Sequence, residues 1–222
     1  MKFIETPLPL ALGAPAPDIT VAAATRDGSI TLSDYRGRSA VLVALFRGLY
    51  CAFCRHHVGL LGLMSDTLRA AGVEPIGIVG SPVDKARFYF QRRPQRYLIG
   101  ADPDLASHRV FGIPRAEMTD DIMQLVVENT DRLAREEGLQ FTPGAGRHVL
   151  DRRDGLVTTE HEPDMYRHQA QFTGQFLIDR DGVVRWSNVE CAGGDLRDID
   201  RFPTCDELLA GARAVMIPEI EA

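Results

Sequence analysis

Apolar runs of strand length alternate with segments of helical periodicity in the first half of the chain. Residues 39–46 (SAVLVALF) and 73–80 (VEPIGIVG) are dominated by apolar residues, as is typical of strands buried on both faces of a parallel sheet. Between them, apolar positions recur at helical spacing from about residue 52, and Gly72 is expected to end that helix. The pattern predicts a strand, a helix and a second parallel strand.

Later segments extend this alternation. Residues 82–93 (PVDKARFYFQRR) predict another helix, and residues 96–112 predict a short strand, a turn and a short helix. Residues 174–190 predict two strands joined by a turn at Asp181-Gly182. A second, short pair of strands is predicted around Asp27-Gly28. Thr204 and Glu207 have the spacing of a capping box at the start of the last helix. This order favours a three-layer α/β domain with a mixed central sheet and helices on both faces.

Periodicity weakens between Pro114 and Thr173. Residues 118–137 have one apolar stripe and predict an amphipathic helix. Residues 147–164 are interpreted as a hairpin around Asp154-Gly155, and residues 160–168, with His161 and His168, as a solvated loop. We therefore expect a single domain over residues 1–222, with an insertion at 114–173 before the C-terminal hairpin.

Composition narrows the function classes. The 222 residues are 45% hydrophobic and carry a net charge of −6, which gives no reason to expect a nucleic-acid partner. The interrupted apolar patch in residues 1–18 predicts an N-terminal arm, not a secretory signal. No apolar stretch is long enough to cross a membrane, so we expect a cytoplasmic protein. In that setting a CxxC pair favours redox chemistry or metal binding over a structural disulfide.

Cys51 and Cys54 form such a pair between the strand at 39–46 and the following helix. The expected position of Cys51 is the first turn of the helix, at the carboxyl end of a central strand, where open α/β sheets commonly react. Unpaired N–H groups there stabilise a thiolate, and Arg47, Arg55 and, when it is protonated, His56 add positive charge nearby. Cys54 would lie on the same helix face, within reach of a disulfide.

Other interpretations of the pair remain open. A zinc site would use Cys51, Cys54, His56 and His57, although structural zinc sites normally bring a second ligand pair from elsewhere. Both cysteines could also pack as inert core residues. Cys191 and Cys205 stand alone, so we expect them to be packed and inert, with a resolving thiol as the alternative role. We predict no metal and no cofactor.

Four blocks together resemble a known family: LGAPAPDI, the run from GSITLSDYRG through FRGLYCAFC to RHHVGLL, ADPDLASHRVFGIPR and GQFLIDRDGVVRW. Their order is similar to that of peroxiredoxin-like proteins of the alkyl hydroperoxide reductase/thiol-specific antioxidant group, and they cover most of residues 12–113 and 173–213. The resemblance implies a thioredoxin-like fold and a thiol peroxidase for hydrogen peroxide or alkyl hydroperoxides. It also implies a dithiol reductant, such as the thioredoxin or glutathione system, and is compatible with a homodimer. A protein disulfide reductase and a non-enzymatic binding or metal module are the alternatives.

The chain departs from the family pattern at three places, one of which is Ala52-Phe53, a dipeptide that lacks the proline of the common thioredoxin loop. In the peroxiredoxin frame P-x-x-x-T-x-x-C, Arg47 replaces the proline, Cys51 replaces the threonine, and only Cys54 matches. Thr173 stands near the place where thioredoxins keep a cis-proline and peroxiredoxins an arginine. We expect Arg47 to supply the guanidinium instead. The frame makes Cys54 the attacking residue, whereas the thioredoxin register makes it Cys51. The helix N-terminus and the burial expected for Cys54 favour Cys51.

Overall fold

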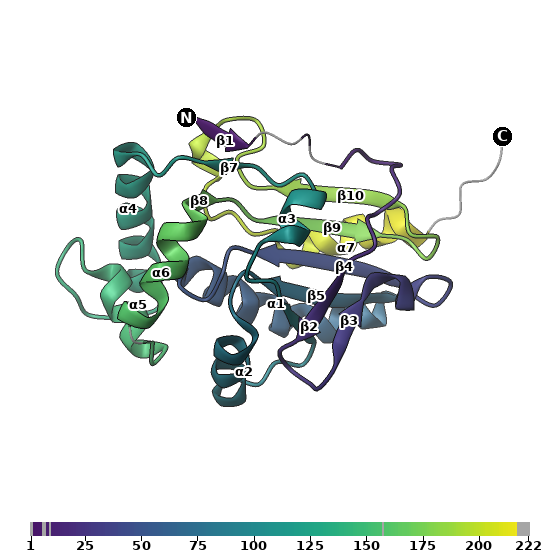
Figure 1. The fold of residues 1–222 in the computed structure, drawn as a ribbon, viewed down its shortest axis with the longest axis horizontal. Coiled ribbons are helices and arrows are strands. Elements are labelled where there is room, and N and C mark those ends of the chain that lie inside the picture. Colours follow the sequence, from purple (N-terminus) through teal and green to yellow (C-terminus); the bar gives the residue numbers. More distant parts are fainter. Residues whose placement is uncertain (1, 6–7, 9, 157, 217–222) are drawn as a thin grey trace.

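The computed structural model describes residues 2–5, 8, 10–156 and 158–216. A mixed sheet of seven strands forms its centre, in the order β10-β9-β4-β5-β6-β2-β3 (Figure 1). The strands are β10 (Val184–Val189), β9 (Gly174–Ile178), β4 (Ala40–Phe46), β5 (Val73–Val79), β6 (Leu98–Ala101), β2 (Thr20–Ala23) and β3 (Ser29–Thr31). The strands β4, β5 and β6 are parallel to one another, and the flanking strand pairs are antiparallel. The predicted mixed sheet and both predicted strand pairs are confirmed.

Strand β4 separates two apolar layers. Its seven residues are all buried: Leu42 and Phe46 belong to the apolar cluster that includes α1 (Ala52–Ala70) and α7 (Cys205–Met216), whereas Val43 belongs to the opposite one. The opposite layer contains α3 (Ala106–Val110) and a small sheet of β1 (Phe3–Glu5), β7 (Arg115–Ala116) and β8 (Ala170–Gln171) (Figure 1). The continuous apolar run in the sequence therefore corresponds to a strand covered on both faces.

The helix ends follow local sequence signals. Gly72, with φ +82°, follows α1, and Thr204 and Glu207 form the predicted capping box, with the Glu207 N–H donating to Thr204 Oγ1 at 3.3 Å. The helix α2 (Val83–Arg92) follows β5, as predicted. Two short 3-10 helices cover Leu32–Tyr35 and Leu196–Asp198. Among the described residues, no helix combines the length and apolar character that crossing a membrane requires.

The 114–173 segment is mostly helical. The helix α4 (Asp120–Glu136) confirms the predicted amphipathic helix, and it is followed by α5 (Gly146–Arg153) and α6 (Thr158–His168). The hairpin predicted around Asp154-Gly155 is wrong, as is the solvated loop that was to contain His168. Gly155 has φ +61° and follows α5, so Asp-Gly acts here as a helix C-terminal signal. The side chain of His161 lies outside the described residues.

These three helices gather at one end of the sheet (Figure 1). Both α4 and α5 pack on α1, the helix that begins at the CxxC pair. The 114–173 segment therefore lies beside the carboxyl ends of the central parallel strands, where the thiols are.

Candidate active site

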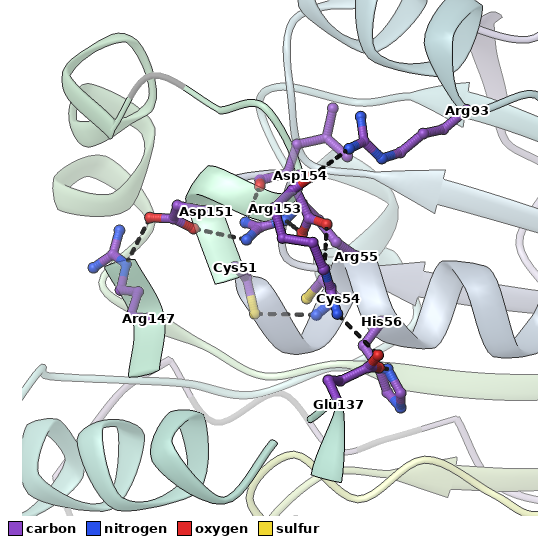
Figure 2. Close-up of polar contacts among 11 residues, drawn as sticks. Cys51, Cys54, Arg55, His56, Arg93, Glu137, Arg147, Asp151, Arg153 and Asp154 are labelled. Atoms are coloured by element: carbon purple, nitrogen blue, oxygen red, sulfur yellow. Dashed lines mark hydrogen bonds and ion pairs between the residues drawn. The ribbon is translucent and has the colours of Figure 1, made fainter. Parts of the chain in front are cut away.

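Cys51 occupies the N-cap position of α1, five residues after β4 ends. Its backbone is extended, and its Sγ atom accepts a hydrogen bond from the Cys54 N–H at 3.3 Å (Figure 2). The sulfur thus takes the place of the oxygen that usually caps a helix, and it contacts one of the donors that the first turn leaves unpaired. An anionic sulfur is favoured at such a position.

The two thiols differ in acidity. Burial by itself would raise the pKa of Cys51, but hydrogen bonds from Cys54 and the charge of Arg47 outweigh burial and lower the pKa to about 6. Burial raises the pKa of Cys54 well above its ordinary value, and the neighbouring Cys51 raises it further. The exposed fractions are 7% for Cys51 and 1% for Cys54. At neutral pH the thiolate therefore resides on Cys51.

Arg47 is buried at the end of β4 with one strong partner. Its Nη2 atom donates to both carboxylate oxygens of Glu190, at 2.7 and 2.6 Å. Glu190 also accepts the N–H groups of Thr173 at 2.8 Å and Asp200 at 2.6 Å. The Arg47 Nε atom has no hydrogen-bond partner among the described residues, although it is buried. The guanidinium is thus fixed by Glu190 and keeps a donor available.

Thr173 does not act as the cis-proline of thioredoxins or the arginine of peroxiredoxins would at its position in the sequence. It precedes β9, and its backbone N–H contacts Glu190, while the described residues contain no cis peptide bond. Thr173 therefore anchors the carboxylate that holds Arg47.

The loop from Arg47 to Cys51 is tightly packed. Gly48 has φ +144°, and a Cβ atom there would lie 2.9 Å from the Gly80 carbonyl oxygen, so only glycine fits. The Leu49 N–H donates to Ser81 Oγ at 2.9 Å, and the Leu49 carbonyl accepts from Arg55 Nη1 at 2.8 Å. The loop that leads to Cys51 is consequently held on both sides.

Arg55 does not act on the thiols as the sequence suggested. Its guanidinium donates to Asp154 at 2.6 Å and to Asp151 at 2.7 Å, and all three side chains are buried (Figure 2). Two carboxylates neutralise this charge, so it adds little positive potential at Cys51. The contact instead fixes α5 to the first turns of α1.

The neighbouring histidines are also occupied. His56 is partly exposed and lies 3.1 Å from Glu137 (Figure 2). Burial lowers the pKa of His57 to about 3, and its ring stacks on Phe202 with centroids 4.9 Å apart. His57 is therefore neutral, and Arg47 is the cation that matters for Cys51.

A small cavity of about 50 Å³ opens onto Cys51. Most of its wall is apolar, and the 114–173 segment supplies more than half of the lining. The residues that line it are Arg47, Tyr50, Cys51, Ala52, Phe53, Met118, Met123, Val126, Thr130, Arg147, Met165 and Gln169. The cavity joins the acidic thiol and the buried guanidinium to an apolar chamber made by α4 and α6.

The remaining cysteines lie apart from this cavity. Cys191 is buried in the apolar cluster on the opposite side of the sheet from Cys51, and burial raises its pKa to about 12. Cys205 is half-buried at the start of α7, and all four thiols are free. Among the described residues, no group of three or more histidine, cysteine, aspartate or glutamate side chains is placed to hold a metal ion.

Sequence reasoning missed several residues of the site. Glu190, Asp151 and Asp154 are charged residues that the fold buries beside arginines, and His168 is a buried histidine at the end of α6. The one local signal for Glu190 was its position, a carboxylate directly after a predicted strand. The partners lie 143 residues apart for Arg47 and Glu190, and no spacing rule connects them.

Several solved structures share this fold. The mitochondrial 2-Cys peroxiredoxin of Plasmodium falciparum aligns with a TM-score of 0.57 and 13% identity, covering 93% of this chain and 94% of that one. The peroxidoxin BcpB of Mycobacterium tuberculosis aligns with 0.54 and 14%, covering 93% and 98%. A putative thiol:disulfide interchange protein DsbE of Chlorobium tepidum aligns with 0.50 and 18%, covering 91% and 99%. At these identities the likeness concerns the fold, which is thioredoxin-like as expected.

The sequence comparisons are more specific about family. No protein with a curated description matches the sequence. The family model described as AhpC/TSA family matches residues 12–187, well over half of the chain and including both cysteines of the pair. This chain belongs to the AhpC/TSA family.

Proposed function

We propose that this protein is a thiol-dependent peroxidase that reduces hydrogen peroxide or small alkyl hydroperoxides. The observation that carries the proposal is the acidic Cys51 thiol in a small, mainly apolar cavity beside the buried Arg47 guanidinium. A thiolate is the nucleophile that attacks a peroxide, and a fixed cation next to it favours both the thiolate and the charge that develops on oxygen.

The reaction proceeds in two chemical steps on the two cysteines. The Cys51 thiolate attacks one peroxide oxygen and the O–O bond breaks, giving a Cys51 sulfenic acid and, with one proton, water or an alcohol. The Cys54 thiol then attacks the Cys51 sulfur, which releases water and forms the Cys51–Cys54 disulfide. An external dithiol returns the pair to the reduced form by thiol–disulfide exchange.

The chain's own residues have distinct parts in this scheme. Cys51 is the nucleophile, Cys54 resolves the sulfenic acid, and Arg47 stabilises the thiolate. The unpartnered Nε–H of Arg47 is a donor that suits a peroxide oxygen in the cavity. We further propose that residues 114–173 are an insertion within one domain over residues 1–222, and that the insertion forms the apolar wall. The reductant, such as the thioredoxin or glutathione system, a cytoplasmic setting and a homodimer remain part of the proposal.

A protein disulfide reductase is the second candidate. The asymmetric acidity of Cys51 and Cys54 suits disulfide exchange equally well, because the first cysteine attacks and the second releases the product. The cavity argues for the peroxidase, since a Cys51 that is 7% exposed under α4 and α6 admits a small peroxide more readily than a protein disulfide.

Turnover with each substrate separates the two candidates. Purified protein is mixed with reduced thioredoxin or glutathione and either hydrogen peroxide, cumene hydroperoxide or insulin as a protein disulfide. We expect peroxide loss above that of a Cys51→Ser/Cys54→Ser variant, and little acceleration of insulin reduction. Peroxide consumption equal to that of the double variant would end the peroxidase proposal. Insulin reduction that is much faster with the wild type than with the double variant, in the same reductant, would favour the reductase.

Mild peroxide treatment is expected to form one disulfide within the CxxC pair. Cys51 and Cys54 are three residues apart, and the Cys51 Sγ atom accepts a hydrogen bond from the Cys54 N–H. Cys191 belongs to the apolar cluster on the opposite side of the sheet. Peptide mass spectrometry should therefore show a loss of two hydrogens in the peptide that contains both cysteines. A disulfide from Cys191 to either cysteine would contradict resolution within the pair.

Arg47→Met is expected to raise the pKa of Cys51 and slow its oxidation. The charge of Arg47 lowers that pKa, and a charge-assisted hydrogen bond to the thiolate would be worth about 1.5–3 kcal/mol. The single variant also leaves Glu190 buried without its partner, so the Arg47→Met/Glu190→Gln double variant is the better-folded test. Stopped-flow oxidation rates within twofold of wild type in both variants would mean that Arg47 is part of the loop but does not stabilise the Cys51 thiolate.

A further inference from the structure

His168 joins the 114–173 segment to the loop that carries Arg47. It is the last residue of α6 and is 2% exposed. Its Nδ1 atom lies 3.2 Å from the Arg47 carbonyl oxygen, and its Nε2 atom lies 3.1 Å from the Pro103 carbonyl oxygen. Its ring also lies beside Tyr50, with centroids 5.7 Å apart. One side chain therefore touches two loops at the carboxyl edge of the sheet and the residue before Cys51.

The Arg47 carbonyl needs a donor at this place. Strand pairing between β4 and β5 ends at Phe46 and Val79, and the neighbouring Gly80 N–H donates to Phe46 instead. A Cβ on Gly80 would lie 2.6 Å from the Arg47 carbonyl oxygen, so this peptide is closely packed as well. A buried carbonyl without a donor is costly, and His168 is the donor that the described residues give it.

Only one of the two ring nitrogens of His168 carries a proton when the imidazole is neutral, and the surroundings favour Nδ1. Both face carbonyl oxygens, which only accept hydrogen bonds, and a neutral imidazole has a single N–H. Placing that N–H on Nδ1 satisfies the Arg47 carbonyl in the fully buried contact, whereas the contact with Pro103 is only part-buried and Pro103 itself is half-buried, within reach of solvent. The contact to Arg47 is therefore the one that the site cannot replace.

We propose that His168 is a positioning residue for Cys51: its Nδ1–H donates to the Arg47 carbonyl and so fixes the loop that sets the Arg47 guanidinium beside the thiolate. This role extends the proposed peroxidase, because it gives α6 a direct part in the acidity of the nucleophile. It also explains why a histidine at the end of a helix in the 114–173 segment is buried against the end of β4.

Two conservative replacements separate the two contacts of the imidazole. Asparagine places an amide nitrogen near the position of Nδ1, and glutamine places one near the position of Nε2. We therefore expect the amide of His168→Asn to keep the hydrogen bond to the Arg47 carbonyl. The amide of His168→Gln would reach the Pro103 carbonyl and leave the Arg47 carbonyl without this donor. His168→Ala removes both, and His148→Ala, an exposed histidine of α5, is the matched control.

The readout is the ionisation of Cys51, which does not depend on peroxidase activity. The reduced proteins are alkylated with iodoacetamide from pH 4.5 to 9, and the modified Cys51 peptide is quantified by mass spectrometry. With the pKa of Cys51 at about 6 in the wild type, a rise of about one unit would lower the thiolate fraction at pH 6 about fivefold. We expect that loss for His168→Ala and His168→Gln, and rates within twofold of wild type for His168→Asn and His148→Ala.

Each result decides the proposal. Where His168→Ala does not fold, the comparison of the asparagine and glutamine variants remains sufficient. Equal alkylation profiles in those two variants, whether both are normal or both are slowed, would overturn the assignment, and so would a normal profile in His168→Gln alone. A protein without peroxidase activity that still shows the expected pattern would refute the proposed function and leave the positioning role intact.

Discussion

Cys51→Ser is expected to abolish peroxide reduction, whereas Cys54→Ser is expected to complete one oxidation and then stop at a sulfenic acid. Cys51 lines the cavity, and its pKa is lowered to about 6, so it supplies the thiolate at neutral pH. The pKa of the buried Cys54 is raised well above its ordinary value, so its thiol is protonated until a sulfenic acid is next to it. The two variants should therefore fail at different steps.

A sulfenic-acid probe and a single-turnover peroxide assay distinguish these outcomes. Cys54→Ser should consume one equivalent of peroxide and label at Cys51 with dimedone, while Cys51→Ser should consume none above background. The double variant sets that background. Peroxide consumption by Cys51→Ser together with no dimedone adduct in Cys54→Ser would reverse the roles and support the peroxiredoxin frame, in which Cys54 attacks.

The acidity of Cys51 also predicts the pH dependence of the first step. Its pKa lies below that of an ordinary cysteine, so the thiolate is present above pH 6 and is lost as the pH falls through about 6. The rate of oxidation should accordingly fall on the acid side of pH 6 and be nearly constant from 7 to 8. A rate that continues to rise up to pH 8.5 would mean that the reacting thiol has an ordinary pKa.

Periodicity predicted the sheet because burial on both faces leaves a direct trace in sequence. The run at residues 39–46 has no polar position after Ser39, and a strand covered on one face only would alternate. The same reasoning placed Cys51 at a helix N-terminus, since a strand that ends at Phe46 and a helix that starts near residue 52 leave little freedom between them. Thus the location of Cys51 followed from local pattern.

The 147–164 hairpin failed because Asp-Gly is an ambiguous signal. A positive φ at glycine serves a hairpin turn and a helix C-terminus equally well, and Gly155 serves the latter. What favours the helix is a contact with another element: Asp151 and Asp154 lie one turn apart and both reach Arg55 of α1. A pairing across almost 100 residues has no signature in a single sequence.

Buried charge was the second class of feature that the sequence could not show. Arg47, Arg55 and Glu190 would each be read as surface residues from composition, because charged side chains are seldom buried without a partner. Here each has at least one charged partner, and the partners come from the segments that meet at the carboxyl edge of the sheet. The thiol's electrostatic environment is therefore set by tertiary contacts, and only its position is set locally.

Glu190→Gln is expected to destabilise the protein and, at the same time, to make Cys51 more acidic. The carboxylate accepts hydrogen bonds from Arg47, Thr173 and Asp200, and a glutamine of the same shape presents an amide N–H to at least one of these donors. Removing one partner of a buried ion pair typically costs about 3–5 kcal/mol in the free energy of unfolding. We expect a loss of that order in urea unfolding, against almost none for the exposed Glu128→Gln of α4.

The change in acidity has the opposite sign to that of Arg47→Met. Glu190 raises the pKa of Cys51, so its removal leaves the Arg47 charge uncompensated except by the thiolate, and the pKa should fall below about 6. Iodoacetamide should then alkylate Cys51 faster at pH 5 in Glu190→Gln than in wild type, although the variant is less stable. General damage to the fold would slow or randomise the alkylation, and a pKa of Cys51 that rises in Glu190→Gln would show that Glu190 acts by holding Arg47 in place and not through its charge.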